Sequence, residues 1–308
     1  MSKAMSEGLS VEAGERLWVA LIRPVLEYGV EVVGGAWVEA ELIQNEVGRR
    51  LLGVRQKTAT DVIRGELGWW SMKSRRDLIK LRFWGRMCRL TNDRLVKKLY
   101  RHLKPINESN RSSWFYQIKT ILISLNLANV WESEEVGTKT NWQIVIKNSL
   151  KIREFREWRE RMDKKPKLRL YRVLKLDLGR EEYLDMDLPL IKRKEITRLR
   201  SGTHMLRVES GRWKKELYKD RTCKICQNDL VETEEHFLLK CYVYERLRDR
   251  MRCNILKDTG IDIELLPSNL VMTLLIGNSG KGSCIKIFSH VAEYIGKAKW
   301  LRAKLLGK

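Results

Sequence analysis

Apolar residues recur every three or four positions along most of the chain, which is the spacing of one face of an α-helix. In residues 38–52, for example, Ile43, Val47 and Leu51 follow at intervals of four, and Gly53 then gives a stop signal. No run of alternating apolar and polar residues indicates a strand. The sequence therefore predicts a mainly α-helical protein. The expected helices span residues 11–23, 38–52, 61–67, 71–90, 114–127, 141–162, 190–200, 242–256 and 283–306.

Prolines, glycines and one serine predict where several of these helices begin and end. Pro24 should interrupt the first helix and Gly29 should end it, whereas Pro166 should break the helix over residues 141–162. Ser71 can cap the helix that follows it, and residues 105–113 are expected to form a connector. Apolar residues expected to face a core are Trp18, Leu21 and Ile22 in the first helix, and Ile287, Val291, Ile295 and Trp300 in the last.

The helix expected over residues 71–90 has two distinct faces. Leu78, Leu81, Trp84 and Cys88 share one side, and Arg75, Arg82, Arg86 and Arg89 share another. Residues 73–104 contain twelve basic and two acidic residues. Solvated helix faces usually mix both signs, so this excess favours binding of a phosphate backbone, although an ordinary solvated face is the alternative.

The whole chain is strongly basic, with 61 Lys and Arg against 39 Asp and Glu and a net charge of +22 over 308 residues. Such a charge attracts polyanions; nucleic acid is the commonest, and an anionic membrane or an acidic protein is the alternative. Residues 147–175 are also basic, but their charges alternate in sign, which favours a salt-bridged helix surface. The eleven tryptophans could stack on bases, although burial is their more frequent use.

The cysteines and the apolar runs bear on the cellular compartment. Three of the six cysteines cluster with a histidine and the rest are scattered, which does not indicate a disulfide framework. Residues 1–10 have no apolar core of the kind a secretory signal needs. The longest apolar runs, such as residues 270–276, are too short to cross a bilayer. We therefore expect a reducing location, in the nucleus or cytoplasm, and no membrane partner.

Residues 223–241 contain the most specific pattern in the chain. Cys223, Cys226, His236 and Cys241 form a C-x2-C-x9-H-x4-C motif. Three thiolates and one imidazole match the donor set and spacing of tetrahedral zinc. The alternative is a group of buried structural cysteines beside a surface histidine. Since spacing and residue types agree, we predict a zinc site with these four ligands.

Local geometry should bring the four side chains together in two steps. Gln227, Asn228 and Asp229 are turn-forming residues that let the chain double back after the first two cysteines. Residues 232–240 are then expected to be helical. His236 and Cys241 are five residues apart and would not share a helix face, so we expect a break near Lys240.

A second basic segment leads into this motif. Arg207, Arg212, Lys214 and Lys215 are expected to bind phosphates, as are the four arginines of the helix over residues 71–90. Trp213 and Tyr218 are interleaved with these cations and could stack on bases.

Several short segments occur in a fixed order along the chain: Arg23–Gly29, Leu51–Gly53, Gly65–Gly68, Phe83–Trp84, Leu199–Gly202, Cys223–Cys226, Glu235–Leu239 with Cys241, and Leu275–Gly277. Taken in this order, they resemble the C-terminal part of non-LTR (LINE-type) retrotransposon reverse transcriptases. The likeness is strongest across residues 199–241, and residues 105–190 carry little of it.

The resemblance implies four segments: a thumb-like helical domain (1–104), a basic helical connector (105–189), a zinc-knuckle region (190–260) and a C-terminal helical segment (261–308). It implies that the thumb holds a template–primer duplex and that the zinc region engages DNA or RNA. The family's polymerase centre needs an adjacent Asp-Asp pair, and none occurs in this chain. Trp69 and Trp70 are expected to be exposed where a polymerase palm would otherwise pack.

We therefore expect a protein that binds RNA or DNA through its basic residues, holds Zn²⁺ structurally, takes no small-molecule substrate and has no catalytic activity alone. Two alternatives remain. The chain could supply thumb and linker to a polymerase palm encoded elsewhere, or it could be a zinc-dependent protein-interaction module.

Overall fold

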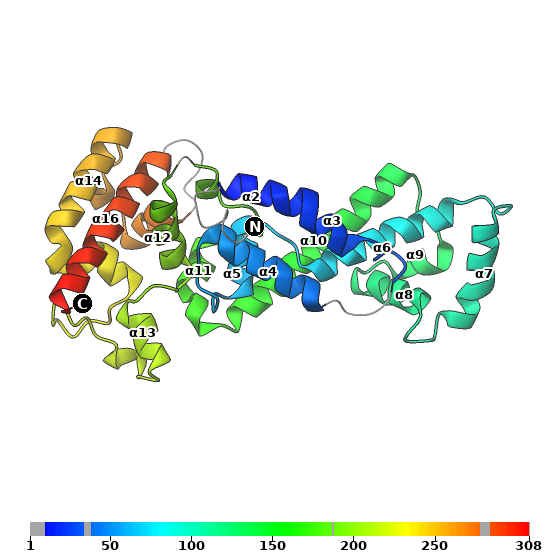
Figure 1. Cartoon of the computed structure of the whole chain (residues 1–308), viewed down its shortest axis with the longest axis horizontal. Helices are drawn as coiled ribbons and strands as arrows, with labels where there is room; N and C mark the ends of the chain where they lie inside the picture. Colours follow the sequence, from blue (N-terminus) through cyan, green and yellow to red (C-terminus); the bar gives the residue numbers. More distant parts are fainter. Residues whose placement is uncertain (1–9, 34–37, 187, 278–283, 308) are drawn as a thin grey trace. The chain divides into compact units, whose positions relative to one another are not determined.

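The computed structural model describes residues 10–33, 38–186, 188–277 and 284–307, and this part of the chain is mainly α-helical, as predicted (Figure 1). Within these residues two isolated antiparallel β-bridges occur, Leu67 with Arg180 and Thr222 with Val231, and no strand. No helix in the described ranges combines the length and apolar character that a bilayer crossing requires. Residues 1–9, where we expect no secretory signal, and Ser283, the expected start of the last helix, lie outside the described residues.

Fifteen of the described segments are α-helices, and short connections join them (Figure 1). In chain order they are α2 (Val11–Leu17), α3 (Arg23–Glu27), α4 (Val38–Leu52), α5 (Thr60–Leu67), α6 (Met72–Arg89), α7 (Leu95–Asn107), α8 (Trp114–Ser124), α9 (Ala128–Ser133), α10 (Lys139–Asp163), α11 (Arg169–Leu174), α12 (Leu190–Arg200), α13 (Arg207–Trp213), α14 (Glu245–Thr259), α15 (Ser268–Ile276) and α16 (Cys284–Leu305).

Short helical turns of other kinds connect or extend these helices. Two are π-helices, η1 (Trp18–Ile22) and η5 (His236–Lys240). Five are 3-10 turns: η2 (Pro166–Leu168), η3 (Glu182–Leu184), η4 (Tyr218–Asp220), η6 (Tyr242–Tyr244) and η7 (Ile263–Leu265).

The chain folds into two compact units. One comprises Met1–Glu15, Gly48–Trp69 and Arg161–Lys308, and the other comprises Arg16–Val47 and Trp70–Glu160. Helices α2, α4 and α10 therefore contribute to both units. This grouping does not test the division into four segments expected from the sequence, which stays a prediction.

The core of the first unit, which also carries the Cys/His motif, is built around α16. Ile287, Val291 and Ile295 are buried as predicted, against residues of α12, α14 and α15. Trp300 was expected beside them but is 67% exposed. Counted at 100° per residue, Trp300 points roughly opposite to this buried stripe, and Ala298 takes the core position instead.

The core of the second unit centres on Trp84 of α6. Its ring stacks on Trp131 at 5.8 Å between centroids and packs against Trp142 at 5.6 Å, and its Nε1 donates to the Tyr100 hydroxyl at 3.1 Å. Leu78 and Leu81 are buried on the same face, as predicted. Tryptophan in this unit is therefore used mainly for packing.

The start of α6 confirms its predicted cap. The hydroxyl of Ser71 accepts the backbone N–H of Ser74 at 3.1 Å. The same hydroxyl donates to Glu154 at 2.7 Å, and Arg153 forms an ion pair with Asp77. Arg153 is one of the alternating charges of residues 147–175, for which a salt-bridged helix surface was expected. Its partner Asp77 belongs to another helix, and both side chains are buried.

Three expectations about the N-terminal half are wrong. Pro24 does not break the first helix, because the wider turn of η1 precedes it and α3 continues through it. Leu21 is 60% exposed rather than on a buried side. Trp69 is buried and its Nε1 donates to Glu15 at 2.6 Å, and Trp70 is half-buried.

Candidate metal centre

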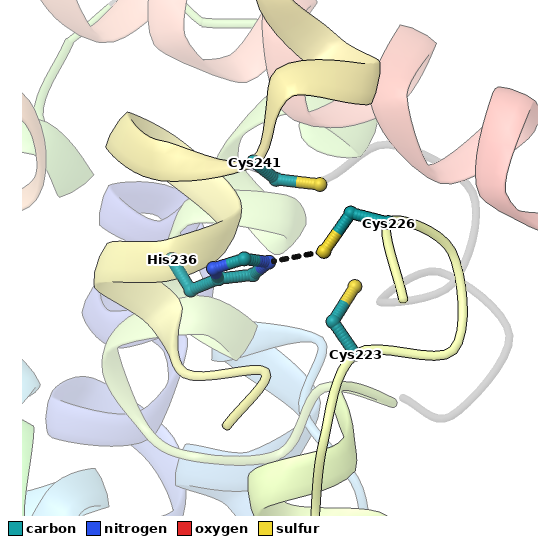
Figure 2. Close-up of side chains that lie close together, drawn as sticks. All are labelled: Cys223, Cys226, His236 and Cys241. Atoms are coloured by element: carbon teal, nitrogen blue, oxygen red, sulfur yellow. Dashed lines mark hydrogen bonds between the residues drawn. The ribbon is translucent and has the colours of Figure 1, made fainter. Parts of the chain in front are cut away.

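The four side chains of the C-x2-C-x9-H-x4-C motif converge on one point (Figure 2). All four are buried, and their ligand atoms lie within 4.8 Å of one another. The Sγ of Cys226 lies 3.5 Å from Nε2 of His236. A tetrahedron with metal–sulfur bonds near 2.3 Å and a metal–nitrogen bond near 2.0 Å would have a sulfur–nitrogen edge of roughly 3.5 Å. The cluster therefore has the size and the donors of a metal site.

The first two cysteines sit in a tight turn, the knuckle, here defined as residues 222–231. The backbone N–H of Cys223 donates to the carbonyl of Leu230 at 2.8 Å, and Thr222 pairs with Val231. Between them Gln227 and Asp229 adopt left-handed backbone angles, with φ of 56° and 47°. The predicted turn-forming residues thus reverse the chain, as expected.

The histidine and the last cysteine are brought together by η5. The helix begins after Thr233, whose hydroxyl accepts the backbone N–H of His236 at 3.0 Å. From His236 onward the helix widens, and the N–H of Cys241 donates to the carbonyl of His236 at 2.8 Å. The expected break near Lys240 is present, because Cys241 is already extended with ψ of 116°. The π-helical turn itself was not predicted.

Burial decides between the two interpretations of the motif. His236 is 3% exposed and points at the sulfur atoms, so it is not a surface histidine (Figure 2). None of the three cysteines of the cluster forms a disulfide, and Cys88 and Cys253 are free thiols as well. The structure therefore contains a buried Cys3His cluster able to hold a metal ion.

The three thiols of the cluster differ in pKa: that of Cys223 is lowered, and those of Cys226 and Cys241 are raised. A hydrogen bond from Cys241 lowers the pKa of Cys223, helped by the backbone N–H groups of Cys226 and Ile225. The same hydrogen bond to Cys223 raises the pKa of Cys241, and burial raises the pKa of Cys226. Three thiolates this close repel one another, so a bound divalent cation is what would let all three ionise.

Groups behind the ligands fix the two halves of the cluster. The buried guanidinium of Arg248 donates to the carbonyl of Cys241 at 2.7 Å and to that of Leu238 at 3.0 Å. The hydroxyl of Tyr242 donates to the carbonyl of Cys226 at 3.2 Å, which ties the knuckle to the chain after Cys241. The Nδ1 of His236 is buried and has no hydrogen-bond partner among the described residues. The ring is therefore held by burial and by η5 rather than by the carboxylate or carbonyl that metal-bound histidines usually have.

The arginines predicted on α6 form an exposed stripe in the second unit. Arg82, Arg86 and Arg89 are exposed and have no ion pair within the described ranges. Arg75, at the start of the stripe, forms an ion pair with Glu27 instead. Three of the four cations thus offer their charge to solvent.

The basic residues predicted before the motif divide in the same way. Arg207 is paired with Glu216, and Arg212 donates to Glu209 at 3.0 Å. Lys214 and Lys215 are exposed at the end of α13, without an ion pair to any residue that the structure describes. The two arginines therefore form contacts within the fold, whereas the two lysines are exposed cations that a phosphate could reach.

No protein-family model matches the chain, and no curated protein or solved structure matches it either. The metal centre therefore rests on its own donor set and geometry.

Sequence patterns missed other cations close to the motif. Arg198 of α12 and Lys299 and Arg302 of α16 share one cavity with Lys214, although about a hundred residues separate the two helices. Lys224, between two ligand cysteines, lines the same cavity. No local spacing joins these residues, so only the fold reveals the group.

Proposed function

We propose that the Cys3His cluster binds Zn²⁺ and that the ion is structural. The donor set supports zinc, since tetrahedral sites with three sulfurs and one imidazole are typical of it. Four protein ligands fill the coordination sphere and leave no position for a reactive water. Cys223, Cys226 and Cys241 would bind as thiolates and His236 as a neutral imidazole through Nε2. The ion would hold the knuckle against η5, and its affinity would fall in acid.

We further propose that the chain binds nucleic acid and has no catalytic activity of its own. The observation that supports this most directly is the stripe of Arg82, Arg86 and Arg89, three exposed cations at helical spacing in a chain of net charge +22. Arginines spaced along one helix face match a row of phosphates and release counterions on binding. Such contacts position a backbone but read no bases, so sequence selectivity would be weak.

The test is the salt dependence of binding to RNA and DNA, measured by fluorescence anisotropy. Replacing Arg82, Arg86 and Arg89 with glutamine should lower the affinity and reduce the slope of log K against log salt by about 3 for DNA duplex. A matched control replaces Lys139, Lys147 and Lys151, exposed lysines of α10 in the same unit. Equal losses of affinity in both variants would mean that the stripe contributes only through the net charge of the chain. No binding at low salt would refute the proposal.

The proposed relationship is to the C-terminal thumb and zinc-knuckle region of non-LTR retrotransposon reverse transcriptases. It is supported by the order of the short matching segments and by the Cys3His cluster within residues 199–241, where the likeness is strongest. Under this proposal the stripe on α6 would face a nucleic-acid duplex, and the zinc region would engage RNA or DNA.

A second candidate is that the chain completes a polymerase palm supplied in trans. Apolar side chains near the start of the second unit favour it: Leu21, Val25 and Tyr28 are 60%, 71% and 88% exposed. Exposed apolar surface of this kind marks a contact with another protein. Adding the chain to a separately expressed palm fragment should then increase primer extension, and no increase would remove this candidate.

A zinc-dependent protein-interaction module is the remaining alternative. Helix α7 supports it, because Leu95, Leu99 and Ile106 are 69%, 50% and 63% exposed on one side of that helix. This alternative would be favoured over nucleic-acid binding if no RNA or DNA binds at low salt while the protein still holds its metal.

A further inference from the structure

A cavity of about 700 Å³ opens in the first unit beside the metal centre. It is lined by α12, α13, the knuckle and the last turns of α16. Its inner wall is apolar, and Leu199, Leu206, Phe237 and Ile295 contribute to it. A volume of this size and character is typical of sites that enclose a small organic group.

The wall also carries an excess of positive charge. Six basic side chains line the cavity, against one acidic residue, Glu195. Arg198 and Lys299 both pair with Glu195, and Arg207 and Arg302 are paired with glutamates outside the cavity. Lys214 and Lys224 are exposed and have no ion pair within the described residues. The ligand should therefore combine an apolar body with negative charge.

An indole ring stands at the same cavity. Trp213, the last residue of α13, is 45% exposed, whereas most tryptophans of this chain pack in its cores. The guanidinium carbon of Arg55 lies 5.6 Å from the ring centroid. A cation beside an exposed indole is an arrangement that holds a flat aromatic group well.

We propose that this cavity receives an unpaired base of a single-stranded nucleic acid. The base would stack on Trp213 and the apolar wall, and its flanking phosphates would bind Lys214 and Lys224. A base within a duplex is stacked on both faces and paired along one edge, and these contacts must be broken before it can enter a cavity. The site therefore favours single strands. This inference rests on the proposed nucleic-acid binding and adds the class of strand and its point of entry.

The metal centre and the cavity share part of the chain. Lys224 lies between the ligands Cys223 and Cys226, and Phe237 follows the ligand His236. Loss of the metal should therefore displace both a cation and part of the apolar wall. Base capture would then depend on the metal although no nucleotide touches it.

The test compares Trp213→Ala with Trp300→Ala, a tryptophan of α16 that is 67% exposed and does not line the cavity. Binding of a fluorescent single-stranded oligonucleotide and of a duplex of equal length is measured for the full chain at one salt concentration. Trp213→Ala should weaken single-strand binding on the order of tenfold and leave duplex binding unchanged. Trp300→Ala should change neither, and Trp213→Phe should restore most of the affinity.

A second pair of variants tests the cation. Lys214→Gln should weaken single-strand binding more than Lys219→Gln, since Lys219 is exposed nearby but outside the cavity. Zinc content and melting temperature are measured for every variant, so that a folding defect is recognised.

The outcomes separate the two proposals. If the wild-type chain binds neither strand form, the proposed function fails and the inference fails with it. If it binds both but Trp213→Ala has no effect, or weakens both equally, the cavity does not capture a base. If polyglutamate, a polyanion without bases, displaces the single strand from wild type and Trp213→Ala equally well, the cavity serves an acidic partner and the inference is overturned.

Discussion

The backbone N–H of Cys241 donates to the carbonyl oxygen of His236 at 2.8 Å, five residues earlier in the chain. In a regular α-helix two residues five apart point about 140° away from each other. The π-helical turn of η5 closes this gap, and it brings the last two donors of the cluster onto one side. The x4 spacing of the motif is therefore met by a wider helix rather than by a sharp loop.

Replacing one ligand should release the metal. Purified wild type should contain about one zinc per chain, and Cys226→Ser well under one, because serine is a poor donor for this ion. Cys253→Ser is the matched control, since Cys253 is an exposed thiol of α14 outside the cluster. Elemental analysis with a thermal melt measures both effects. Equal zinc in both variants would exclude the site.

Arg248→Met should destabilise the metal-bearing unit without removing a ligand. The substitution leaves the carbonyls of Leu238 and Cys241 without the donors that Arg248 gives them, at a cost of about 1–3 kcal/mol in the free energy of unfolding. Arg246→Met, on the exposed side of the same helix, should change this free energy by less than about 0.5 kcal/mol. Denaturant titration gives both values. Similar losses of unfolding free energy in the two variants would mean that the hydrogen bonds of Arg248 do not stabilise this unit.

Two glycines inside helices should respond to alanine with opposite signs. A Cβ at Gly85 of α6 would lie 2.3 Å from Nε1 of Trp142, so Gly85→Ala should lower stability by about 1–3 kcal/mol. At Gly296 of α16 nothing lies within 4 Å, and Gly296→Ala should raise stability by about 0.5–1 kcal/mol. Melting temperatures should therefore move in opposite directions. A stabilising Gly85→Ala would show that the indole has room to move.

Asp61 should make the first unit sensitive to acid. Burial alone would raise the pKa of this carboxyl, but hydrogen bonds from Arg161 and Lys165 outweigh burial and lower the pKa below its ordinary value. A lowered pKa in the folded state adds stability that is fully present above the ordinary pKa near 3.9. This stability is lost as the pH falls below that value and through the lower pKa of the folded state.

The measurement is the melting temperature of wild type and Asp61→Asn between about pH 7 and pH 2. Asp61→Asn should lose about 1–3 kcal/mol at neutral pH and show a flatter decline in acid. Asp220→Asn, at an exposed position, should follow the wild-type curve. A parallel decline in wild type and Asp61→Asn would assign the acid sensitivity to other carboxylates.

Local patterns in the sequence determined most helices and the ligand set. The helices over Val38–Leu52 and Leu190–Arg200 have the predicted bounds, because their periodicity and their stop signals are properties of neighbouring residues. Helices α7, α9, α11, α13 and α15 escaped prediction. In α7 the usual pattern is inverted: Lys97 and Tyr100 are buried against Glu134 and leucines face outward.

The tertiary structure alone decided how the charges and aromatic rings are used. Arg75, Arg207 and Arg212 look like the exposed cations in sequence, but each meets a carboxylate in the fold. Trp213 and Trp300 differ in the same way, since only the packing of α12, α13 and α16 places one of them at a cavity. A coordinating motif lies within nineteen consecutive residues and is readable locally, whereas a cavity joins side chains that long-range packing brings together.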